Sequence, residues 1–474
     1  MTEIHELSVI ELAAAIRDRQ LSPVAVADHY LRRTQQLNEQ VGAFFTVTAE
    51  LAAEQARAAE RAVMRAQDPA ALPPLTGVPV PVKDLNMVAG VRQTLGSAAF
   101  ASNVPDADDH VVTRLREAGA VITGKTACPE FGLPCYTETA VGPPARTPWD
   151  LSRSAGGSSG GAAAAVAAGL APAAQGSDGG GSIRIPSSAC GLFGIKPSRG
   201  RISEGPLMPD LAGLGTNGPI ARTVADAALL LDVMAGNFPG DMYTQPPLPP
   251  GESFLGCARR DPGRLRIGRT LQNPVEGAEV HPDCVAAYEE ASALLAALGH
   301  EVTDVSMPIG PDAVPYFETL WHAYATLVPL QPGQEELLRP LTRYLRGRGL
   351  ATGAAELVFA QAYLQAVTRG ALAATAGYDA ILTPTLAMPP APVGWFEEVD
   401  PPQNFERQKR FTPFTAVYNV SGQPAVSVPL HWTAAGLPVG VMLAGRMGAE
   451  GTLISLSAQL EAERPWKDRH PPLW

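Results

Sequence analysis

Two runs of glycine and serine constrain this chain more than any other feature of its sequence. One spans residues 156–161 (GGSSGG) and the other spans residues 176–189 (GSDGGGSIRIPSSA), where Ser182 follows three consecutive glycines. Because glycine has no side chain, such a run lets the backbone turn several N–H groups toward one point. A hydroxyl beside converging N–H donors suits acyl transfer, since the donors stabilise a developing oxyanion. The second run therefore predicts a nucleophilic site at Ser182.

A lysine upstream of both runs is a candidate base. Lys83 ends the segment 77–83, in which Val78, Val80 and Val82 alternate with glycine and proline. This pattern predicts a short strand with a partly buried lysine at its end. Burial penalises the charged form of a lysine, lowers its pKa and lets it act as a base. A surface lysine at the end of a strand is the alternative that these residues leave open.

The composition argues against several classes of protein. The 474 residues carry a formal net charge of −11 and no long run of lysine or arginine, which argues against a nucleic-acid-binding surface. The five cysteines form no C-x-x-C pair and the eight histidines show no metal-binding spacing, so we expect free thiols, no metal and no cofactor. The first residues lack the apolar core of a signal peptide, and the apolar stretch 162–174 is too short to cross a bilayer. We therefore expect a cytoplasmic protein without a membrane partner.

Helix and strand patterns alternate along much of the chain. About residues 1–70 are typical of helices, and helices and strands then alternate over about 75–235. Strands are expected at 78–82 and 120–123 within that part. This alternation predicts an α/β fold built in layers.

The later part of the chain adds a second helical segment and a late hairpin. The helical segment covers about 314–376 and contains an aromatic cluster that includes Phe317 and Trp321. Such clusters are usually core, and lining a ligand pocket is the alternative. The apolar runs 424–430 and 439–444, joined through a glycine, are typical of two paired strands.

Two local motifs fit their surroundings poorly. Residues 119–126 (GAVITGKT) match a phosphate-binding P-loop, but a helical pattern precedes them and their variable positions are typical of a strand. Residues 156–160 match the nucleophile elbow of α/β-hydrolases, which would make Ser158 the nucleophile and would require a later histidine. The candidates are His322 and His431, and a loop-like sequence stands where that motif needs a strand.

The same segments resemble the amidase signature family. The family's signature is similar to residues 154–184, and further landmarks are similar to residues 148–150, 191–197 and 422–425. The resemblance covers essentially the whole chain. It implies a single α/β domain over residues 1–474, with a mixed central β-sheet flanked by helices on both faces. Within that domain it implies a helical first part over about 1–70, a signature core over about 75–235 and a pocket-covering helical segment over about 314–376.

The resemblance also implies catalytic roles. Ser182 matches the family's nucleophile, Ser158 matches a bridging serine and Lys83 matches the base. In the family a cis peptide bond precedes the bridging serine, and here that bond would join Gly157 to Ser158.

Around the nucleophile the resemblance implies a supporting loop. The backbone N–H groups that match the oxyanion hole belong to Gly179, Gly180, Gly181 and Ser182. The side chains that match the support of this loop belong to Asp178 and Arg184.

For the substrate, the late segment 421–441 is similar to the branch of the family that includes 6-aminohexanoate cyclic-dimer hydrolase and enzymes of aryl amides, lactams or carbamates. The expected pocket residues are Leu133, Pro134, Cys135, Tyr136, Phe317 and Trp321. The segment 133–136 is less polar than in the cyclic-dimer hydrolase, which predicts that the substrate is a small, fairly apolar amide, anilide, lactam or carbamate. Ala127 and Thr147 depart from the family by standing where it often has asparagine.

Two other functions remain open at this point. The first is the glutamine-hydrolysing subunit of a tRNA-dependent amidotransferase, against which the acidic charge weighs. The second is a non-catalytic binding protein, against which the three filled catalytic positions weigh. We expect a small-molecule amide substrate, no nucleic-acid partner, and a monomer or a homodimer.

Overall fold

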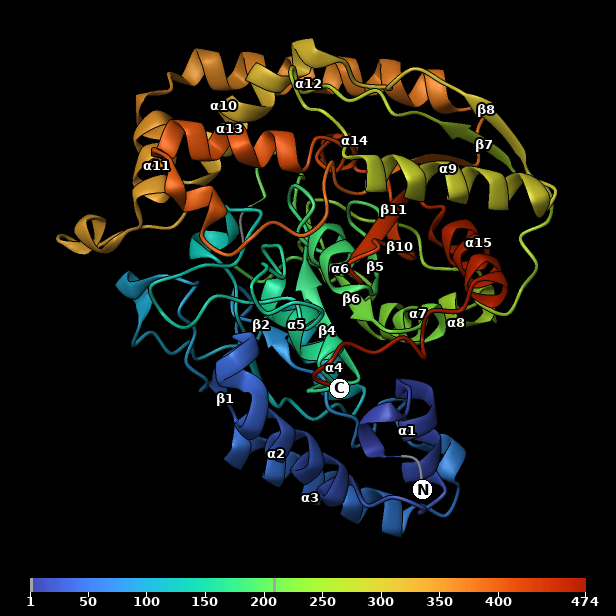
Figure 1. The fold of residues 1–474 in the computed structure, drawn as a ribbon. Helices are drawn as coiled ribbons and strands as arrows, with labels where there is room; N and C mark the ends of the chain where they lie inside the picture. Colours follow the sequence, from blue (N-terminus) through green and yellow to red (C-terminus); the bar gives the residue numbers. More distant parts are fainter. Residues whose placement is uncertain (1–2, 208–209) are drawn as a thin grey trace.

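A mixed sheet organises the molecule (Figure 1). The structure is a computed structural model that describes residues 3–207 and 210–474. Within these residues the sheet has eight strands, and their order is β4 (Ala173–Ser177), β6 (Asn217–Ala221), β5 (Phe193–Lys196), β10 (Ala425–Trp432), β11 (Pro438–Gly445), β9 (Ala380–Pro384), β7 (Arg266–Arg269) and β8 (Glu301–Asp304). β7 runs parallel to β8 and β9, and the other neighbours pair antiparallel. The expected late hairpin is confirmed as β10 and β11.

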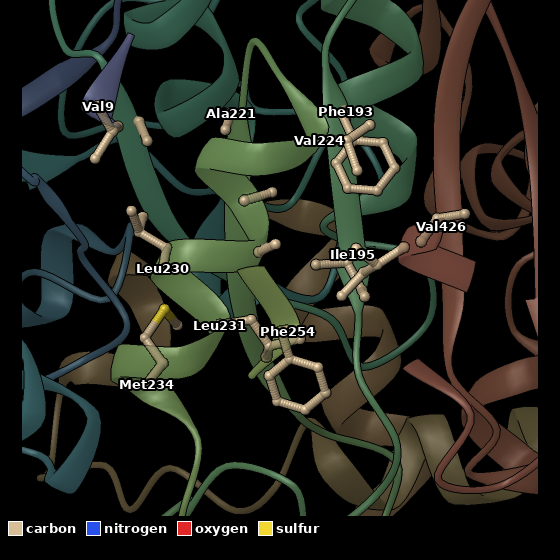
Figure 2. Close-up of a cluster of buried hydrophobic side chains, with 14 of the residues drawn as sticks. Val9, Phe193, Ile195, Ala221, Val224, Leu230, Leu231, Met234, Phe254 and Val426 are labelled. Carbon is tan, nitrogen blue, oxygen red and sulfur yellow. The ribbon is translucent and has the colours of Figure 1, made fainter. Parts of the chain in front are cut away.

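Helices cover both faces of this sheet. Alternate residues of β10 and β11 belong to two clusters, one with Val426, Val428, Val441 and Leu443, and the other with Ala425, Met442 and Ala444. Because successive strand residues point to opposite faces, both faces are buried. The first cluster includes residues of α7 (Val224–Met234), α9 (Pro282–Ala297) and α15 (Glu450–Glu463), and Figure 2 shows α7 side chains beside β5. The predicted α/β fold with a mixed sheet flanked by helices is thereby confirmed.

A small sheet lies beside the large one and carries the candidate base. It consists of β1 (Phe44–Val47), β3 (Gly124–Thr126) and β2 (Val82–Lys83). The strand predicted at 120–123 is wrong, because the structure starts the strand at Gly124 and leaves Val121 in a single bridge to Pro79. Proline lacks the N–H that a ladder needs, so the two prolines of the facing segment confine regular pairing to its last residues.

Helices also form the two ends of the molecule (Figure 1). The blue end contains α1 (Val9–Arg17), α2 (Pro23–Val41) and α3 (Ala49–Arg65), and a capping box at Ser8 and Glu11 starts α1. The orange end contains α10 (Val314–Tyr324), α11 (Pro340–Ala351), α12 (Ala354–Thr375) and α13 (Pro401–Phe411). The remaining α-helices are α4 (His110–Glu117), α5 (Gly160–Ala167), α6 (Arg184–Cys190), α8 (Phe254–Cys257) and α14 (Val417–Ser421). Across residues 3–207 and 210–474, a helix of the length and apolarity that a bilayer crossing requires is absent.

Candidate active site

Lys83 lies fully buried at the end of β2 and reaches toward both glycine and serine runs. Its Nζ donates to Ser158 Oγ at 2.8 Å, to Ser177 Oγ at 3.0 Å and to the Ser177 carbonyl at 3.3 Å. Its backbone N–H donates to Gln175 Oε1 of β4 at 2.8 Å, which ties the small sheet to the large one. Lys83 is therefore held both at its backbone and at its amine, and the amine contacts the hydroxyl of Ser158.

Burial sets the charge state of this amine. The side chain is 0% exposed, and loss of solvation lowers the pKa of Lys83 to about 8. Cys128, Asp178 and Glu204 act in the opposite direction. A lysine with such a pKa is partly neutral near neutral pH, and a neutral amine can accept a proton from a hydroxyl.

Ser158 and Ser182 lie at the starts of neighbouring helices. Ser158 follows a cis peptide bond after Gly157 and comes just before α5, whereas Ser182 comes just before α6. The Ser159 N–H donates to the Ser182 carbonyl at 3.1 Å and so joins the two runs. Among the hydrogen bonds of the described residues, none joins the Ser158 hydroxyl to the Ser182 hydroxyl. Hydrogen bonds of this kind are often long without substrate and shorten when it binds.

The glycine loop before Ser182 divides its N–H groups between two tasks. The Gly181 N–H donates to Asp178 Oδ1 at 2.7 Å, so it is used inside the loop. This corrects the prediction that Gly181 is a free donor of the oxyanion hole. Gly180 and Ser182 line an apolar cavity that lies over Ser182. The structure therefore narrows the candidate donors to the N–H groups of Gly179, Gly180 and Ser182.

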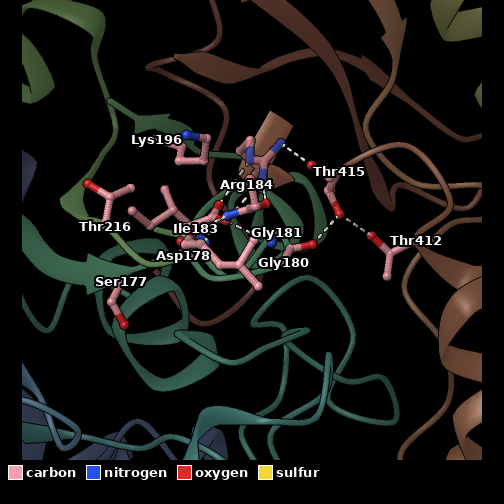
Figure 3. Close-up of polar contacts among 12 residues, drawn as sticks. Ser177, Asp178, Gly180, Gly181, Ile183, Arg184, Lys196, Thr216, Thr412 and Thr415 are labelled. Carbon is pink, nitrogen blue, oxygen red and sulfur yellow. Dashed lines mark hydrogen bonds and ion pairs between the residues drawn. The ribbon is translucent and has the colours of Figure 1, made fainter. Parts of the chain in front are cut away.

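A buried ion pair supports this loop (Figure 3). Arg184 donates to both carboxylate oxygens of Asp178 at 2.9 Å, and both side chains are 0% exposed. Asp178 also accepts from the N–H of Ile183 at 3.1 Å and from Asn419 Nδ2 at 2.9 Å. Burial alone would raise the pKa of Asp178, but the Arg184 guanidinium and these hydrogen bonds hold it well below its usual range. The carboxylate therefore stays ionised and fixes the backbone on both sides of Ser182.

Replacing Arg184 with methionine is expected to destabilise the fold by about 3–5 kcal/mol, because it leaves the Asp178 carboxylate buried without its cation. The matched control is Arg266→Met, since Arg266 pairs with Glu301 at the surface, where the side chains are 54% and 44% exposed. Such a surface pair contributes about 0–1 kcal/mol. Urea unfolding measures both changes, and an equal small loss for the two variants would contradict a structural role of the buried pair.

Gly181 and Gly179 offer a second comparison. A Cβ at Gly181 would lie 2.4 Å from Thr415 Oγ1, and its φ of +136° disfavours any other residue. A Cβ at Gly179 would meet only the Trp321 ring, at 3.8 Å. We expect Gly181→Ala to lose folded protein or nearly all activity and Gly179→Ala to fold normally. Circular dichroism melting with an activity assay tests the pair, and equal melting temperatures would contradict the packing argument.

The cavity over Ser182 is almost entirely apolar. Its empty space is about 840 Å³, including its open mouth. Four expected side chains (Leu133, Cys135, Phe317 and Trp321) and Pro134 line it. Tyr136 was predicted to line the pocket but is not part of the lining. Its ring instead stacks on Phe396 at a centroid distance of 4.5 Å, and its hydroxyl accepts from Asn404 at 2.9 Å.

Several residues of the site escaped the sequence analysis. Thr415 donates to the Gly180 carbonyl at 2.6 Å, and Asn419 donates to Asp178 (Figure 3 shows Thr415). Gln408 lines the cavity and accepts from the Cys135 N–H at 2.9 Å. Ser177 belongs to the second glycine and serine run, which was its one local signal. The other three come more than 200 residues later and have no motif of their own.

The two alternative motifs find no support in the structure. Residues 124–126 form β3 rather than a phosphate loop, and Lys125 makes a buried ion pair with Asp84 at 3.1 Å. His322 packs against Tyr344 and Phe405, and His431 contacts Glu290. Among the hydrogen bonds of the described residues, neither histidine contacts Ser158, whose hydroxyl contacts Lys83. In the described part of the chain, no group of three or more histidine, cysteine, aspartate or glutamate side chains is arranged to hold a metal ion.

Comparison with known proteins agrees with this fold. The family described as Amidase matches residues 25–454. A putative amidase of Synechocystis sp. is 35% identical over 466 residues, covering 98% of this chain and 90% of the relative. The substrate complex of 6-aminohexanoate cyclic dimer hydrolase superposes with a TM-score of 0.90 at 31% identity and 99% coverage of both chains. A bacterial aryl acylamidase superposes with a TM-score of 0.87 at 26% identity and 98% coverage of both.

The fold and the matches define a hydrolase of amide C–N bonds other than peptide bonds. This chain belongs to the amidase signature family.

Proposed function

We propose that this amidase works through an acyl-enzyme on Ser182, with Ser158 and Lys83 as its proton relay. The observation that carries the proposal is the buried 2.8 Å contact between Lys83 Nζ and Ser158 Oγ, beside a cavity that Ser182 lines. Lys83 with a lowered pKa supplies the base, and Ser158, whose hydroxyl contacts that amine and whose neighbour Ser159 bonds to the Ser182 carbonyl, passes the proton.

The proposed reaction has two halves. Neutral Lys83 takes the proton of Ser158 while Ser158 takes the proton of Ser182, and Ser182 Oγ attacks the amide carbonyl. The N–H groups of Gly179, Gly180 and Ser182 stabilise the oxyanion. The proton returns through Ser158 to the leaving nitrogen as the C–N bond breaks. Water then attacks the ester by the same relay, which releases the acid and restores both serines.

The cavity supports a small, fairly apolar substrate. Besides the expected residues, its walls include Ile309, Leu364 and Val417, while Lys409 at the wall is paired with Glu318 and Glu406. Unpaired polar groups in such a cavity would be costly to cover, so apolar acyl groups are favoured. Because the lining spans Leu133 to Val420, we also propose that the chain works as one domain. Five free cysteines suit a reducing compartment, which supports a cytoplasmic location.

A matched substrate series tests this proposal. We expect an anilide of a medium-length fatty acid to have a higher kcat/KM than acetamide, by roughly 10-fold for each 1.4 kcal/mol of added apolar contact. L-Glutamine is the informative comparison, because an amidotransferase subunit would prefer it. A preference for glutamine, or for acetamide over the anilide, would contradict the proposed substrate class.

A further inference from the structure

A second cavity lies apart from the one over Ser182 and shares no lining residue with it. Glu204 lines it, and the other charged or titratable residues at its walls are His110, Arg199, Asp210, Asp241 and Tyr243. It is therefore polar, in contrast to the cavity over Ser182. Its position matters because Glu204 is hydrogen-bonded to Asn217, which in turn contacts Gln175, a partner of Lys83.

A chain of amide hydrogen bonds joins Glu204 to Lys83. Glu204 Oε1 accepts from the backbone N–H of Asn217 at 2.7 Å and from its Nδ2 at 3.1 Å. Asn217 Oδ1 accepts from Gln175 Nε2 at 2.7 Å, and Gln175 Oε1 accepts from the Lys83 N–H at 2.8 Å. Asn217 also pairs with Ser177 between β6 and β4, and Ser177 accepts from Lys83 Nζ. Gln175 and Asn217, the two amide side chains between the carboxylate and the lysine, are buried, whereas Ser177 and Glu204 are partly exposed.

From this arrangement we infer that Glu204 is a positioning residue that influences the charge state of Lys83 through the chain of amide hydrogen bonds. The inference rests on the proposed role of Lys83 as the base. A carboxylate at this place attracts the ammonium form of Lys83, and the amide chain joins that carboxylate to the backbone N–H of the same lysine. Glu204 does not line the cavity over Ser182, so it acts on the reaction only through Lys83.

The surrounding charges support a shared proton. Burial, aided by Asp210 and Asp109, raises the pKa of Glu204 to about 8, while burial lowers the pKa of Lys83 to about 8. Glu204 opposes that lowering, as do Cys128 and Asp178. Other charged residues of this region include Asp84 and Lys125, which pair with each other, Arg199, which packs on Tyr243, and Arg184 and Lys196, which act on Asp178. Two interacting groups that titrate in one range lose their protons in two joint steps.

The sign of the effect follows from this coupling. Ionised Glu204 holds the proton on Lys83, so its removal lets Lys83 become neutral at lower pH. Glu204→Gln keeps an acceptor for Asn217 and removes the charge. We expect the midpoint of the rate against pH to fall by less than about one pH unit, because Cys128 and Asp178 act more strongly on Lys83 than Glu204 does. We also expect the high-pH rate to fall several-fold, because a weaker base has less driving force.

The rate of Ser182 sulfonylation by phenylmethylsulfonyl fluoride is the readout, since it needs no natural substrate. It is measured from pH 6 to 10 for the parent chain, Glu204→Gln, Glu204→Asp and the control Asp241→Asn. Asp241 lines the same cavity but bonds to Ser203 and the Phe238 N–H, outside the amide chain. The control is expected to keep the parent midpoint. Glu204→Asp keeps the charge and is expected to lie between the parent and Glu204→Gln.

An unchanged or raised midpoint in Glu204→Gln, beside a full sulfonylation rate, would overturn the inference. If that variant does not fold, an unchanged midpoint in Glu204→Asp with a lowered rate assigns Glu204 a structural role only, which also overturns it. Failure of the proposed function is distinct, because it would show as normal sulfonylation in a Lys83→Ala variant.

Discussion

Replacing Ser182 with alanine is expected to lower kcat on the order of 10⁴- to 10⁶-fold, because the variant cannot form the acyl-enzyme. The oxyanion donors and the cavity stay in place, so substrate should still bind with a nearly unchanged dissociation constant. Amide hydrolysis followed by release of the amine, together with calorimetric binding of a product acid, measures the two effects separately.

Ser188→Ala is the matched control for Ser182→Ala. Ser188 is a buried serine of α6 that accepts from the Gly440 N–H at 2.9 Å, away from the cavity. Its loss should cost about 1–3 kcal/mol of stability for the unpaired N–H and leave kcat close to that of the parent. Full hydrolysis by Ser182→Ala would contradict the nucleophile assignment, whereas equal losses in both variants would point to a general defect of the helix.

Replacing Lys83 with alanine is expected to lower kcat/KM on the order of 10²- to 10⁴-fold, the usual contribution of a general base. Only the neutral amine accepts a proton, so in the parent chain the rate should rise with pH through a midpoint near 8 and then level off. The rate falls at lower pH because Lys83 becomes an ammonium. A plot of kcat/KM from pH 6 to 10 measures this midpoint.

Lys83→Arg separates the charge from the base. Arginine keeps a cation at this position but does not become neutral in this range, so we expect it to be as inactive as Lys83→Ala at every pH. In both variants the residual rate should lose the midpoint near 8. A parent-like pH profile in either variant would assign that midpoint to another group and remove Lys83 from the mechanism.

The catalytic candidates could be predicted from sequence because their signals are local. Ser182 and Ser158 each lie within a short run of glycine and serine, and Lys83 ends an apolar segment. Local patterning also predicted the helical character of the first 70 residues and the β10–β11 hairpin. The mixed sheet itself followed from the resemblance to a family, because strand order depends on contacts between distant parts of the chain.

The rest of the site depends on contacts that a local pattern does not show. Thr415 reaches the Gly180 carbonyl from 235 residues away, so no sequence window contains both. The Gly181 N–H does not serve the oxyanion hole, because it donates to the side chain of Asp178. Tyr136 follows Cys135, which lines the cavity, yet its ring packs on Phe396 instead. In each case tertiary packing determines the orientation or the hydrogen-bond partner of a group, which the residue type alone does not determine.

The most direct test of the central claim is to locate the nucleophile chemically. The chain is treated with a fluorophosphonate, its intact mass is measured, and any adduct is mapped to a peptide. We predict a single adduct on Ser182, at a rate that depends on Lys83, and none in Ser182→Ala. An adduct on Ser158, or one that forms equally well without Lys83, would contradict the account.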